Sequence, residues 1–440
     1  MRIKKFFIDN KFLSLIAFLT TILFLYYETP WGLMDDYKNL ILIQDLISSP
    51  FQTYFKFTYD RTFISGMFQP FYLLQMFFQY YPGMLIFPGL TYIFNSFILL
   101  YIHHNLFKAV KRIYDIDYQI SLTAFLIWPY TYDLFLHPSL QEKFIFLLFS
   151  FLLLFFADSK KENHLKIFLA SFTLPLIKLQ GSIFIGYSLV MYLQKKSKKT
   201  LISILGFSIG ILIQAYIIFF IDTDYFVYSS NISKFTNNLL ILPNFLFFLL
   251  TIFFLLVMVI FKKEKRYESL GLFLSSIFLI FIYSNWNIYG YLLASYAFFI
   301  AIFVPILYIE ILEKTVNLKR VKSFFKPLFV LLMVISMVNF FIPRLERWQQ
   351  ITEVVEELKN PIDEKVYYCA IEGTKWLNQI ENINNEIFFV NNLREIKNEY
   401  FYFINDEFQC SFFTTELRNN CNTLTEVLPR KRFYLTKNSC

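Results

Sequence analysis

Residues 11–37, KFLSLIAFLTTILFLYYETPWGLMDDY, combine a long apolar run with two adjacent carboxylates at its end. A helix needs about 20 apolar residues to cross the hydrocarbon core of a membrane. Basic residues precede the run and no small-residue cleavage site follows it, so we expect a retained span and not a signal peptide. Asp35 and Asp36 would then lie just beyond the span, at the membrane surface.

The composition of the whole chain agrees with a membrane protein. Of its 440 residues, 56% are hydrophobic and only 17% are charged, and the mean hydropathy is +0.48. So few charges would not cover that much apolar surface in water. Disordered chains are polar and poor in aromatic residues, whereas this chain contains 58 Phe and 30 Tyr. Disorder is excluded, a soluble enzyme is disfavoured, and we expect a polytopic α-helical membrane protein.

Further apolar runs predict about eleven transmembrane helices in residues 1–343. Besides the first, the runs lie at 84–104, 118–136, 143–157, 201–221, 239–261, 267–284, 288–310 and 327–343. The segment 166–194 adds two short helices. Because Pro175, Lys178 and Gly181 interrupt it and both flanks are basic, we expect a hairpin that returns to its starting side.

Lysine and arginine are distributed in the way that fixes the orientation of a membrane protein. The segments that we place in the cytoplasm hold 23 of these residues, and the rest of the chain up to residue 343 holds 6. This pattern predicts a cytoplasmic N-terminus and an extracytoplasmic C-terminal part, in a bacterial cytoplasmic membrane. The net charge of +8 therefore needs no nucleic-acid partner, because its basic residues do not gather on one soluble face.

Residues 344–440 have the composition of a small soluble domain, which we expect to be α/β and extracytoplasmic. We predict a helical stretch at 348–359 and strands at 365–371, 386–390, 400–404 and 432–435. All four cysteines lie in this part: Cys369, Cys410, Cys421 and Cys440. They favour one or two disulfides, with three pairings open if all four join. A zinc site is disfavoured, because there is no CxxC pair and no His in this part.

The first outer loop, 28–83, carries the first candidate site residues. Two close carboxylates, Asp35 and Asp36, raise one another's pKa and suit a general base or a cation-binding pair. The alternative is a helix start with acids at its positive end. Arg61 could hold a phosphate bidentately, or else pair with Asp60 or anchor the loop at the interface.

The second outer loop is short and adds Glu142 and His137 on the same side of the membrane. A carboxylate beside an imidazole would suit acid–base chemistry or contact with an acceptor. The alternative is a solvated turn in which Glu142 pairs locally with Lys143.

Two later segments complete the candidate site. Lys178 lies within an apolar hairpin, where an ammonium group needs an anion; a lipid phosphate approached by the amides near Gly181 would serve. The alternative is snorkelling to the outer interface. Trp286 and Tyr289 lie in a last outer turn and are either interface-belt residues or a platform for stacking on a sugar.

In the order and sidedness of these residues, the chain resembles the GT-C superfold of integral-membrane glycosyltransferases. That superfold includes oligosaccharyltransferases, protein O-mannosyltransferases and the aminoarabinose transferase that acts on lipid A. Asp35-Asp36 matches the family's first acidic pair, and Glu142 matches the acid of the second outer loop. Lys178-x-Gln180-Gly181 looks like the family's Lys-x-x-Gly in a short-helix hairpin. Residues 287–293 look like its late Gly-Arg-Tyr-Leu-Leu pattern, but the Arg is absent, which puts a phosphate contact there in doubt.

The resemblance implies a glycosyltransferase whose donor is a sugar on polyprenyl phosphate and whose acceptor is a lipid, a glycan or a protein. Asp36 or Asp35 would deprotonate the acceptor hydroxyl. Lys178, with Gln180 and Gly181 beside it and Arg61 as a second candidate, would bind the departing phosphate. Glu142 would orient the acceptor or a cation. A divalent metal is required by some relatives and not by others, so metal dependence stays open.

Three other classes of function remain as alternatives, and one of them is a purely structural or adhesion membrane protein whose active part is the C-terminal domain. A transporter or flippase of lipid-linked glycans would be expected to show inverted repeats and ionisable pairs inside the bundle, and the sequence shows no repeat. A polymerase or ligase of lipid-linked glycans would place its functional residues in a large late outer loop, whereas the long loop here is the first. The identity of the sugar and the class of acceptor stay open.

Overall fold

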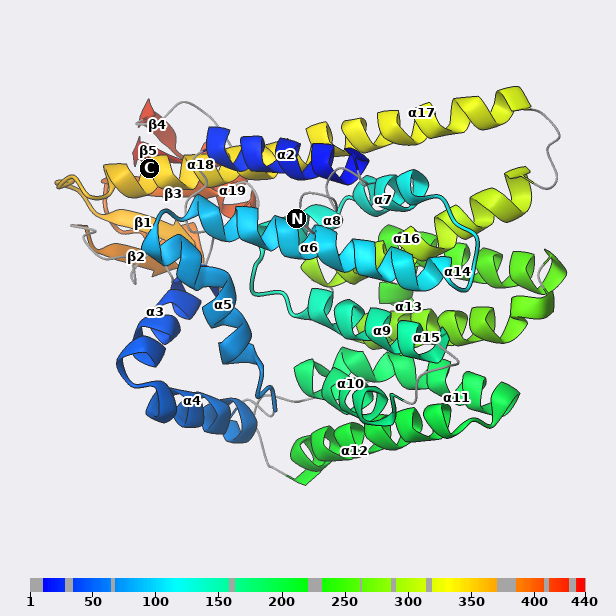
Figure 1. The fold of residues 1–440 in the computed structure, drawn as a ribbon. Helices are drawn as coiled ribbons and strands as arrows, with labels where there is room; N and C mark the ends of the chain where they lie inside the picture. The colour runs from blue at the N-terminus through cyan, green and yellow to red at the C-terminus, as the bar shows by residue number, and fades with distance from the viewer. Residues whose placement is uncertain are drawn as a thin grey trace.

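The computed structural model describes residues 11–27, 35–64, 68–157, 163–220, 232–261, 263–285, 290–313, 319–369, 385–406, 411–426 and 433–439. Within these ranges the chain forms a large helical bundle and one five-stranded sheet, whose strands all lie after residue 365 (Figure 1). The predicted helical fold is therefore present.

Most helices of the bundle overlap the apolar runs of the sequence; α13 is an exception, because most of it precedes the run 239–261. The helices of the bundle are α2 (Lys11–Tyr26), α6 (Gly89–Lys111), α7 (Tyr118–Ile127), α8 (Thr131–Leu136), α9 (Glu142–Ala157), α10 (His164–Ile177), α11 (Ile185–Lys195), α12 (Lys198–Phe220), α13 (Ile232–Leu240), α14 (Leu242–Phe261), α15 (Arg266–Asn285), α16 (Tyr296–Leu307) and α17 (Lys319–Ser336). Among the described residues, five helical segments are long and apolar enough to cross a membrane: Lys198–Ile217, Leu242–Ile260, Arg266–Ser284, Leu293–Ile311 and Phe324–Glu357. This agrees with a helical membrane protein.

The run 118–136, which we expected to form one span, is two helices. α7 ends before Trp128, whose backbone is extended, with φ −68° and ψ 118°. The next residue is Pro129, and a proline disfavours the helical conformation in the residue before it. The short helix α8 follows. The first of the two helices therefore ends further from Glu142 along the chain than the apolar run 118–136 indicated.

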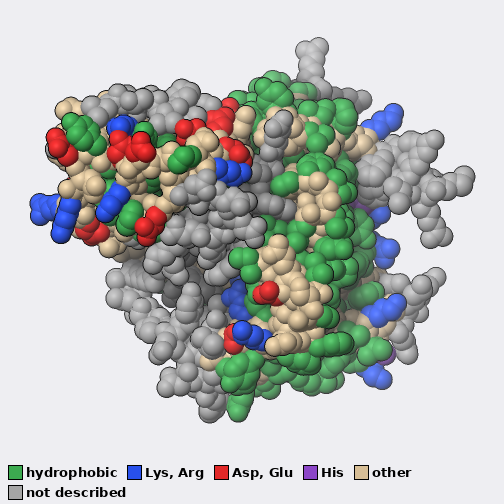
Figure 2. Space-filling model, turned by 90° about the vertical axis from the view of Figure 1, so that its left-hand side faces the viewer, with side chains coloured by type: hydrophobic (Ala, Val, Ile, Leu, Met, Phe, Trp, Pro, Cys, Tyr) green, Lys and Arg blue, Asp and Glu red, His purple; other side chains and the backbone are tan. Residues whose placement is uncertain are grey.

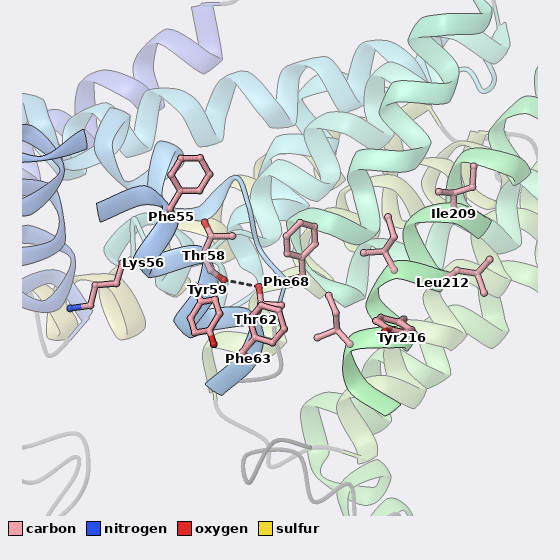
Figure 3. Close-up of a pocket in the computed structure, with 12 residues that line it drawn as sticks. Phe55, Lys56, Thr58, Tyr59, Thr62, Phe63, Phe68, Ile209, Leu212 and Tyr216 are labelled. Atoms are coloured by element: carbon pink, nitrogen blue, oxygen red, sulfur yellow. Dashed lines mark hydrogen bonds between the residues drawn. The ribbon is translucent and has the colours of Figure 1, made fainter. Parts of the chain in front are cut away.

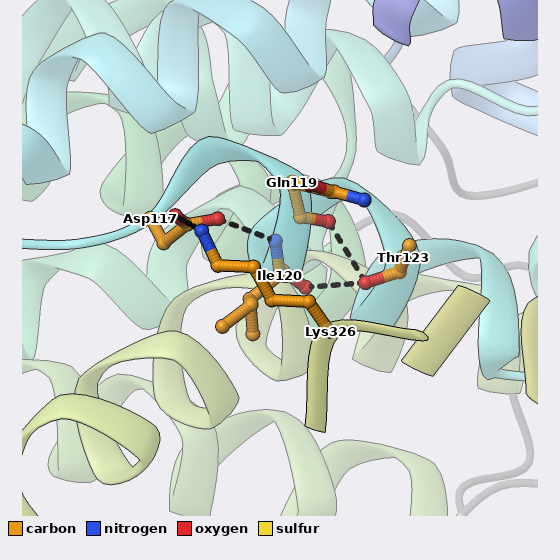
Figure 4. A network of polar contacts seen from close by, with 5 residues as sticks. All are labelled: Asp117, Gln119, Ile120, Thr123 and Lys326. Atoms are coloured by element: carbon orange, nitrogen blue, oxygen red, sulfur yellow. Dashed lines mark hydrogen bonds and ion pairs between the residues drawn. The ribbon is translucent and has the colours of Figure 1, made fainter. Parts of the chain in front are cut away.

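The start of α7 is fixed by a polar contact with α17 (Figure 4). Asp117 caps α7 by accepting a hydrogen bond from the backbone N–H of Ile120, at 3.0 Å. Its other carboxylate oxygen lies 2.6 Å from Nζ of Lys326. Both residues lie in or beside segments that the sequence places in the cytoplasm, so this pair joins two helix ends on one side of the bundle.

The segment 28–83, which the sequence predicts as the first outer loop, is also helical in its described part. It contains α3 (Asp35–Ser48), α4 (Pro50–Tyr59), the π-helical turn η1 (Asp60–Ile64) and α5 (Tyr72–Leu85). Leu40 and Ile43 of α3 pack on Met76 and Tyr80 of α5. In Figure 1 these helices lie at the same end of the bundle as the sheet. The end of α14, the start of α15, the end of α16 and the start of α17 lie at the opposite end.

The sheet has the strand order β2-β1-β3-β5-β4. Its strands are β1 (Val366–Cys369), β2 (Ile387–Val390), β3 (Tyr400–Asp406), β4 (Asn422–Glu426) and β5 (Phe433–Ser439), and helix α19 (Ser411–Asn420) precedes β4. β1 pairs in parallel with β2 and β3, whereas β5 is antiparallel to β3 and β4. Four strands lie where the sequence predicted them, and β4 was not predicted.

Helix α18 (Ile342–Glu357) connects the bundle to the sheet. On the bundle side, the ring of Trp348 lies 5.0 Å from that of Tyr92, which itself stacks on Phe24 of α2. α18 also packs against β5. Figure 2 shows the change in surface character: acidic and basic side chains are mixed in the upper left, and hydrophobic side chains cover the tall region on the right.

Candidate functional site

The break between α10 and α11 is the first part of the candidate site. α10 contains Pro175 in its last turn and ends at Ile177, and the backbone of the next residue, Lys178, is extended. A 3-10 turn, Leu179–Phe184, then leads into α11. A Cβ on Gly181 would lie 2.0 Å from the carbonyl oxygen of Leu174, so only glycine allows the chain to fold back this closely. The expected interruption between two short helices is present.

Lys178 and Glu142, which are 36 residues apart in sequence, form an ion pair. The Nζ of Lys178 lies 2.5 Å from Oε1 of Glu142. Glu142 begins α9, and its side chain is only 2% exposed, whereas that of Lys178 is 21% exposed. The anion that Lys178 requires is therefore supplied by the protein itself.

The alternative of a local pair between Glu142 and Lys143 in a solvated turn is wrong. Lys143 is fully buried, and its Nζ donates to Oδ1 of Asn95 and, at 2.7 Å, to the carbonyl of Pro138. Nδ2 of Asn95 donates in turn to the carbonyls of Leu134 and Phe135, each at 2.8 Å. This network ties α6 to α8 and to the turn that leads into Glu142.

Several polar atoms near the ion pair are buried without a hydrogen-bond partner among the described residues. They are Oε2 of Glu142, Nε2 of the adjacent Gln141, and both amide atoms of Gln180. Buried polar groups are normally paired, because each unpaired one loses its hydration without compensation. This concentration of unsatisfied donors and acceptors is the property expected of a site that binds a polar group.

An apolar groove of about 1040 Å³ lies between the first outer loop and α12 (Figure 3). Its lining residues are Phe55, Lys56, Thr58, Tyr59, Thr62, Phe63, Phe68, Ile209, Leu212, Ile213, Tyr216 and Ile217. Gln214 of α12 joins this groove to the hairpin: its Nε2 donates to the carbonyl of Phe68 at 2.7 Å and to that of Pro175 at 3.1 Å. The groove therefore approaches the chain three residues before Lys178.

Arg61 lies in η1 and packs against aromatic rings. Its guanidinium carbon is 4.9 Å from the ring centroid of Tyr72 and 5.5 Å from that of Phe57. The hydroxyl of Tyr72 donates to Asn39 of α3 at 3.1 Å. Among the described residues Arg61 forms no ion pair with Asp60, so stacking holds the guanidinium in place.

Asp35 and Asp36 form the first turn of α3, one turn before Asn39. This is the position in which the helix dipole stabilises carboxylates, as the helix-start alternative expected. The side chains of both residues lie outside the described part of the structure. Trp286 and Tyr289 also lie outside the described residues, so their predicted contact with a sugar stays a prediction.

His137 lies between α8 and α9 and contacts the helix that leads to the sheet. Its ring centroid is 6.0 Å from that of Trp348, edge to face. Burial, together with the charges of Arg344, Arg347 and Lys143, lowers the pKa of His137 to about 4. The imidazole is therefore neutral at pH 7, and its ring packs on Trp348 of α18.

The described residues contain no group of three or more His, Cys, Asp or Glu side chains placed to hold a metal ion. Cys369 and Cys421 are each disulfide-bonded, as the cysteine distribution predicted, and their partners lie outside the described residues. No family model, no curated protein and no solved structure matches the chain.

Three features of the site were not predicted from the sequence: the Asn95–Lys143 network, Gln214 and the groove. Asn95 and Gln214 are isolated polar residues within long apolar runs, and this isolation was the signal that could have identified them. The groove carries no such signal, because its walls come from segments about 150 residues apart.

Proposed function

We propose that the protein is an integral-membrane glycosyltransferase that moves a sugar from a polyprenyl-phosphate donor to a lipid, glycan or protein acceptor on the extracytoplasmic face. The connection through Gln214 supports this function most directly, because it joins an apolar groove to a segment that bears a cation. A polyprenyl phosphate has these two parts, a long apolar chain and an anionic head.

The donor would lie with its chain in the groove and its phosphate at Lys178. The side chain of Lys178 is partly exposed, and Gln180 offers a buried amide with no partner among the described residues. Charge on the departing phosphate develops as the bond to the sugar breaks, so an ammonium group placed there would stabilise the transition state. Arg61, held on Phe57 and Tyr72, would be a second cation for the same phosphate.

The acceptor hydroxyl would be activated by Asp36 or Asp35 at the start of α3. Asn39, one turn further along α3, accepts a hydrogen bond from Tyr72, and Arg61 stacks on the ring of Tyr72. The helix α3 and Arg61 therefore lie close together. Glu142 and His137 would position the acceptor, and Trp286 and Tyr289 would contact a sugar. We propose about eleven spans with the N-terminus cytoplasmic, and residues 344–440 as an extracytoplasmic domain.

The test is transfer of sugar by the full chain reconstituted with polyprenyl-phosphate sugars prepared from the native membrane. We expect Asp35→Asn or Asp36→Asn to abolish transfer, with a loss of about 100-fold or more, because the general base is removed. Asp45→Asn is the control, since Asp45 is an exposed carboxylate of the same helix. Full activity in both site variants would contradict the proposed chemistry.

A flippase of lipid-linked glycans is the competing function, and the groove favours it equally, since a flippase also holds a lipid chain. The two functions differ in product. Movement of a labelled lipid-linked glycan across proteoliposomes, without any new glycosidic bond, would identify a flippase. A change in acceptor mass by one sugar would identify a transferase.

A further inference from the structure

We infer that the carboxylate of Glu142 and the phosphate of a donor compete for the ammonium group of Lys178. Glu142 pairs with Lys178 until a phosphate binds there and displaces it. This inference rests on the proposed function, because it concerns the site at which the donor phosphate would bind. It assigns to Glu142 control over donor binding, a role distinct from contact with the acceptor.

In the geometry of the pair, Glu142 contacts Lys178 from the buried side, and a phosphate would reach Lys178 from the exposed side. The carboxylate lies inside, with its side chain 2% exposed, and it contacts Nζ at 2.5 Å. The ammonium group of Lys178 is on the more open side, with 21% of the side chain exposed. A lysine has three N–H donors, of which Oε1 of Glu142 accepts one. A phosphate would therefore meet the ammonium group from the open side and then displace Glu142 from it.

The charges of the pair cancel, and this cancellation is what creates the competition. A neutral ion pair attracts an arriving anion far less than a free ammonium group would. A phosphate placed on Lys178 also faces a carboxylate at close range, and like charges at close range disfavour one another. Donor binding must therefore draw Glu142 away from Lys178.

The surroundings provide groups that can receive Glu142 when it leaves. Oε2 of Glu142 has no partner among the described residues, and neither has Nε2 of Gln141 or Nε2 of Gln180. Gln141 adjoins Glu142 in sequence, and Gln180 is two residues from Lys178. Each member of the pair thus has an amide donor close by in the chain, and a carboxylate that accepts from such donors stays satisfied in a buried place.

The experiment measures the affinity of the purified full chain in nanodiscs for farnesyl phosphate, with farnesol as the uncharged probe. Glu142→Gln keeps the shape of the side chain but removes the competing charge. We expect it to bind farnesyl phosphate about tenfold more tightly than the wild type, and farnesol unchanged. Lys178→Met should bind farnesyl phosphate at least about tenfold more weakly, because the cation is lost.

Two controls make the comparison specific. Asp117→Asn breaks the ion pair with Lys326 at the other end of the bundle and should leave both affinities unchanged. Glu142→Asp keeps the charge but shortens the side chain, and it should tighten phosphate binding less than Glu142→Gln does. This second variant keeps the test decisive if Glu142→Gln folds poorly.

The outcomes separate this inference from the proposed function. If Lys178→Met weakens phosphate binding but neither Glu142 variant strengthens it, competition is overturned and the phosphate contact stands. If Lys178→Met binds farnesyl phosphate as well as the wild type does, Lys178 is not the phosphate ligand, and both the inference and that part of the proposed function fail.

Discussion

At the scale of single residues, Gly181 determines whether Lys178 can occupy its place. The turn after Lys178 lies directly on the last turn of α10, where the carbonyl of Leu174 leaves no room for a side chain. The ion pair with Glu142 depends on this return of the chain, because it brings the end of α10 against the start of α9. Packing and chemistry are therefore coupled at one glycine.

We expect Gly181→Ala to destabilise the protein by about 2–3 kcal/mol, because its Cβ would overlap backbone atoms that cannot move independently. Gly186→Ala is the control: its Cβ would meet the ring of Phe278 at 3.1 Å, and a side chain can shift. Its expected cost is under about 1 kcal/mol. Thermal unfolding in detergent measures both, and equal midpoints for the two variants would show that the turn is not held as described.

At the scale of elements, α4 has two unlike faces. One face is attached to α5: the Tyr54 hydroxyl donates to the carbonyl of Pro70, and Phe57 stacks on Tyr72. The other face presents aromatic side chains every four residues along α4 and η1, all of them exposed: Phe51, Phe55, Tyr59 and Phe63. This stripe borders the groove opposite α12, a candidate membrane span with its own exposed apolar residues.

We expect the aromatic stripe of α4 to lie in lipid. A nitroxide on Phe55→Cys, where the native side chain is 67% exposed, should be more accessible to oxygen than to a polar nickel complex in nanodiscs. The matched control is Phe412→Cys on α19, where Phe412 is 74% exposed, and there the preference should be reversed. A preference for the nickel complex at position 55 would contradict lipid contact.

At the scale of the whole molecule, the arrangement of helix ends agrees with the charge pattern of the sequence. The end of α14, the start of α15, the end of α16 and the start of α17 lie at one end of the bundle, and helices α3 to α5 and the sheet lie at the other (Figure 1). The Asp117–Lys326 pair joins two segments that the charge pattern places at the cytoplasmic end. An orientation with the sheet outside follows if the basic end faces the cytoplasm.

This orientation predicts a pattern of labelling in intact cells. A membrane-impermeant thiol reagent should modify Asp45→Cys in α3 and Phe412→Cys in α19, and it should modify Ser197→Cys between α11 and α12 only after the membrane is opened. Labelling of Ser197→Cys in intact cells, with no labelling of the other two, would reverse the proposed sidedness.

The positions of the helices could be predicted from hydropathy because apolar runs must be buried in protein or lipid. The division of the run 118–136 could also have been predicted, since Pro129 lies in its middle. Strand β4, Asn422–Glu426, could not be predicted, because its sequence NTLTE has few apolar residues. Its extended conformation depends on pairing with β5. The Glu142–Lys178 pair depends on the fold, although two isolated charges in apolar surroundings are candidates to meet.

The position of β5 between β3 and β4 has a consequence for biosynthesis. β4 hydrogen-bonds only to β5 among the described strands, and β5 is made after both of its neighbours. The growing chain must therefore hold a gap beside β3 while α19 and β4 emerge, and β5 fills it last. During this interval the edge of β3 presents unpaired backbone N–H and C=O groups, with which another strand can pair.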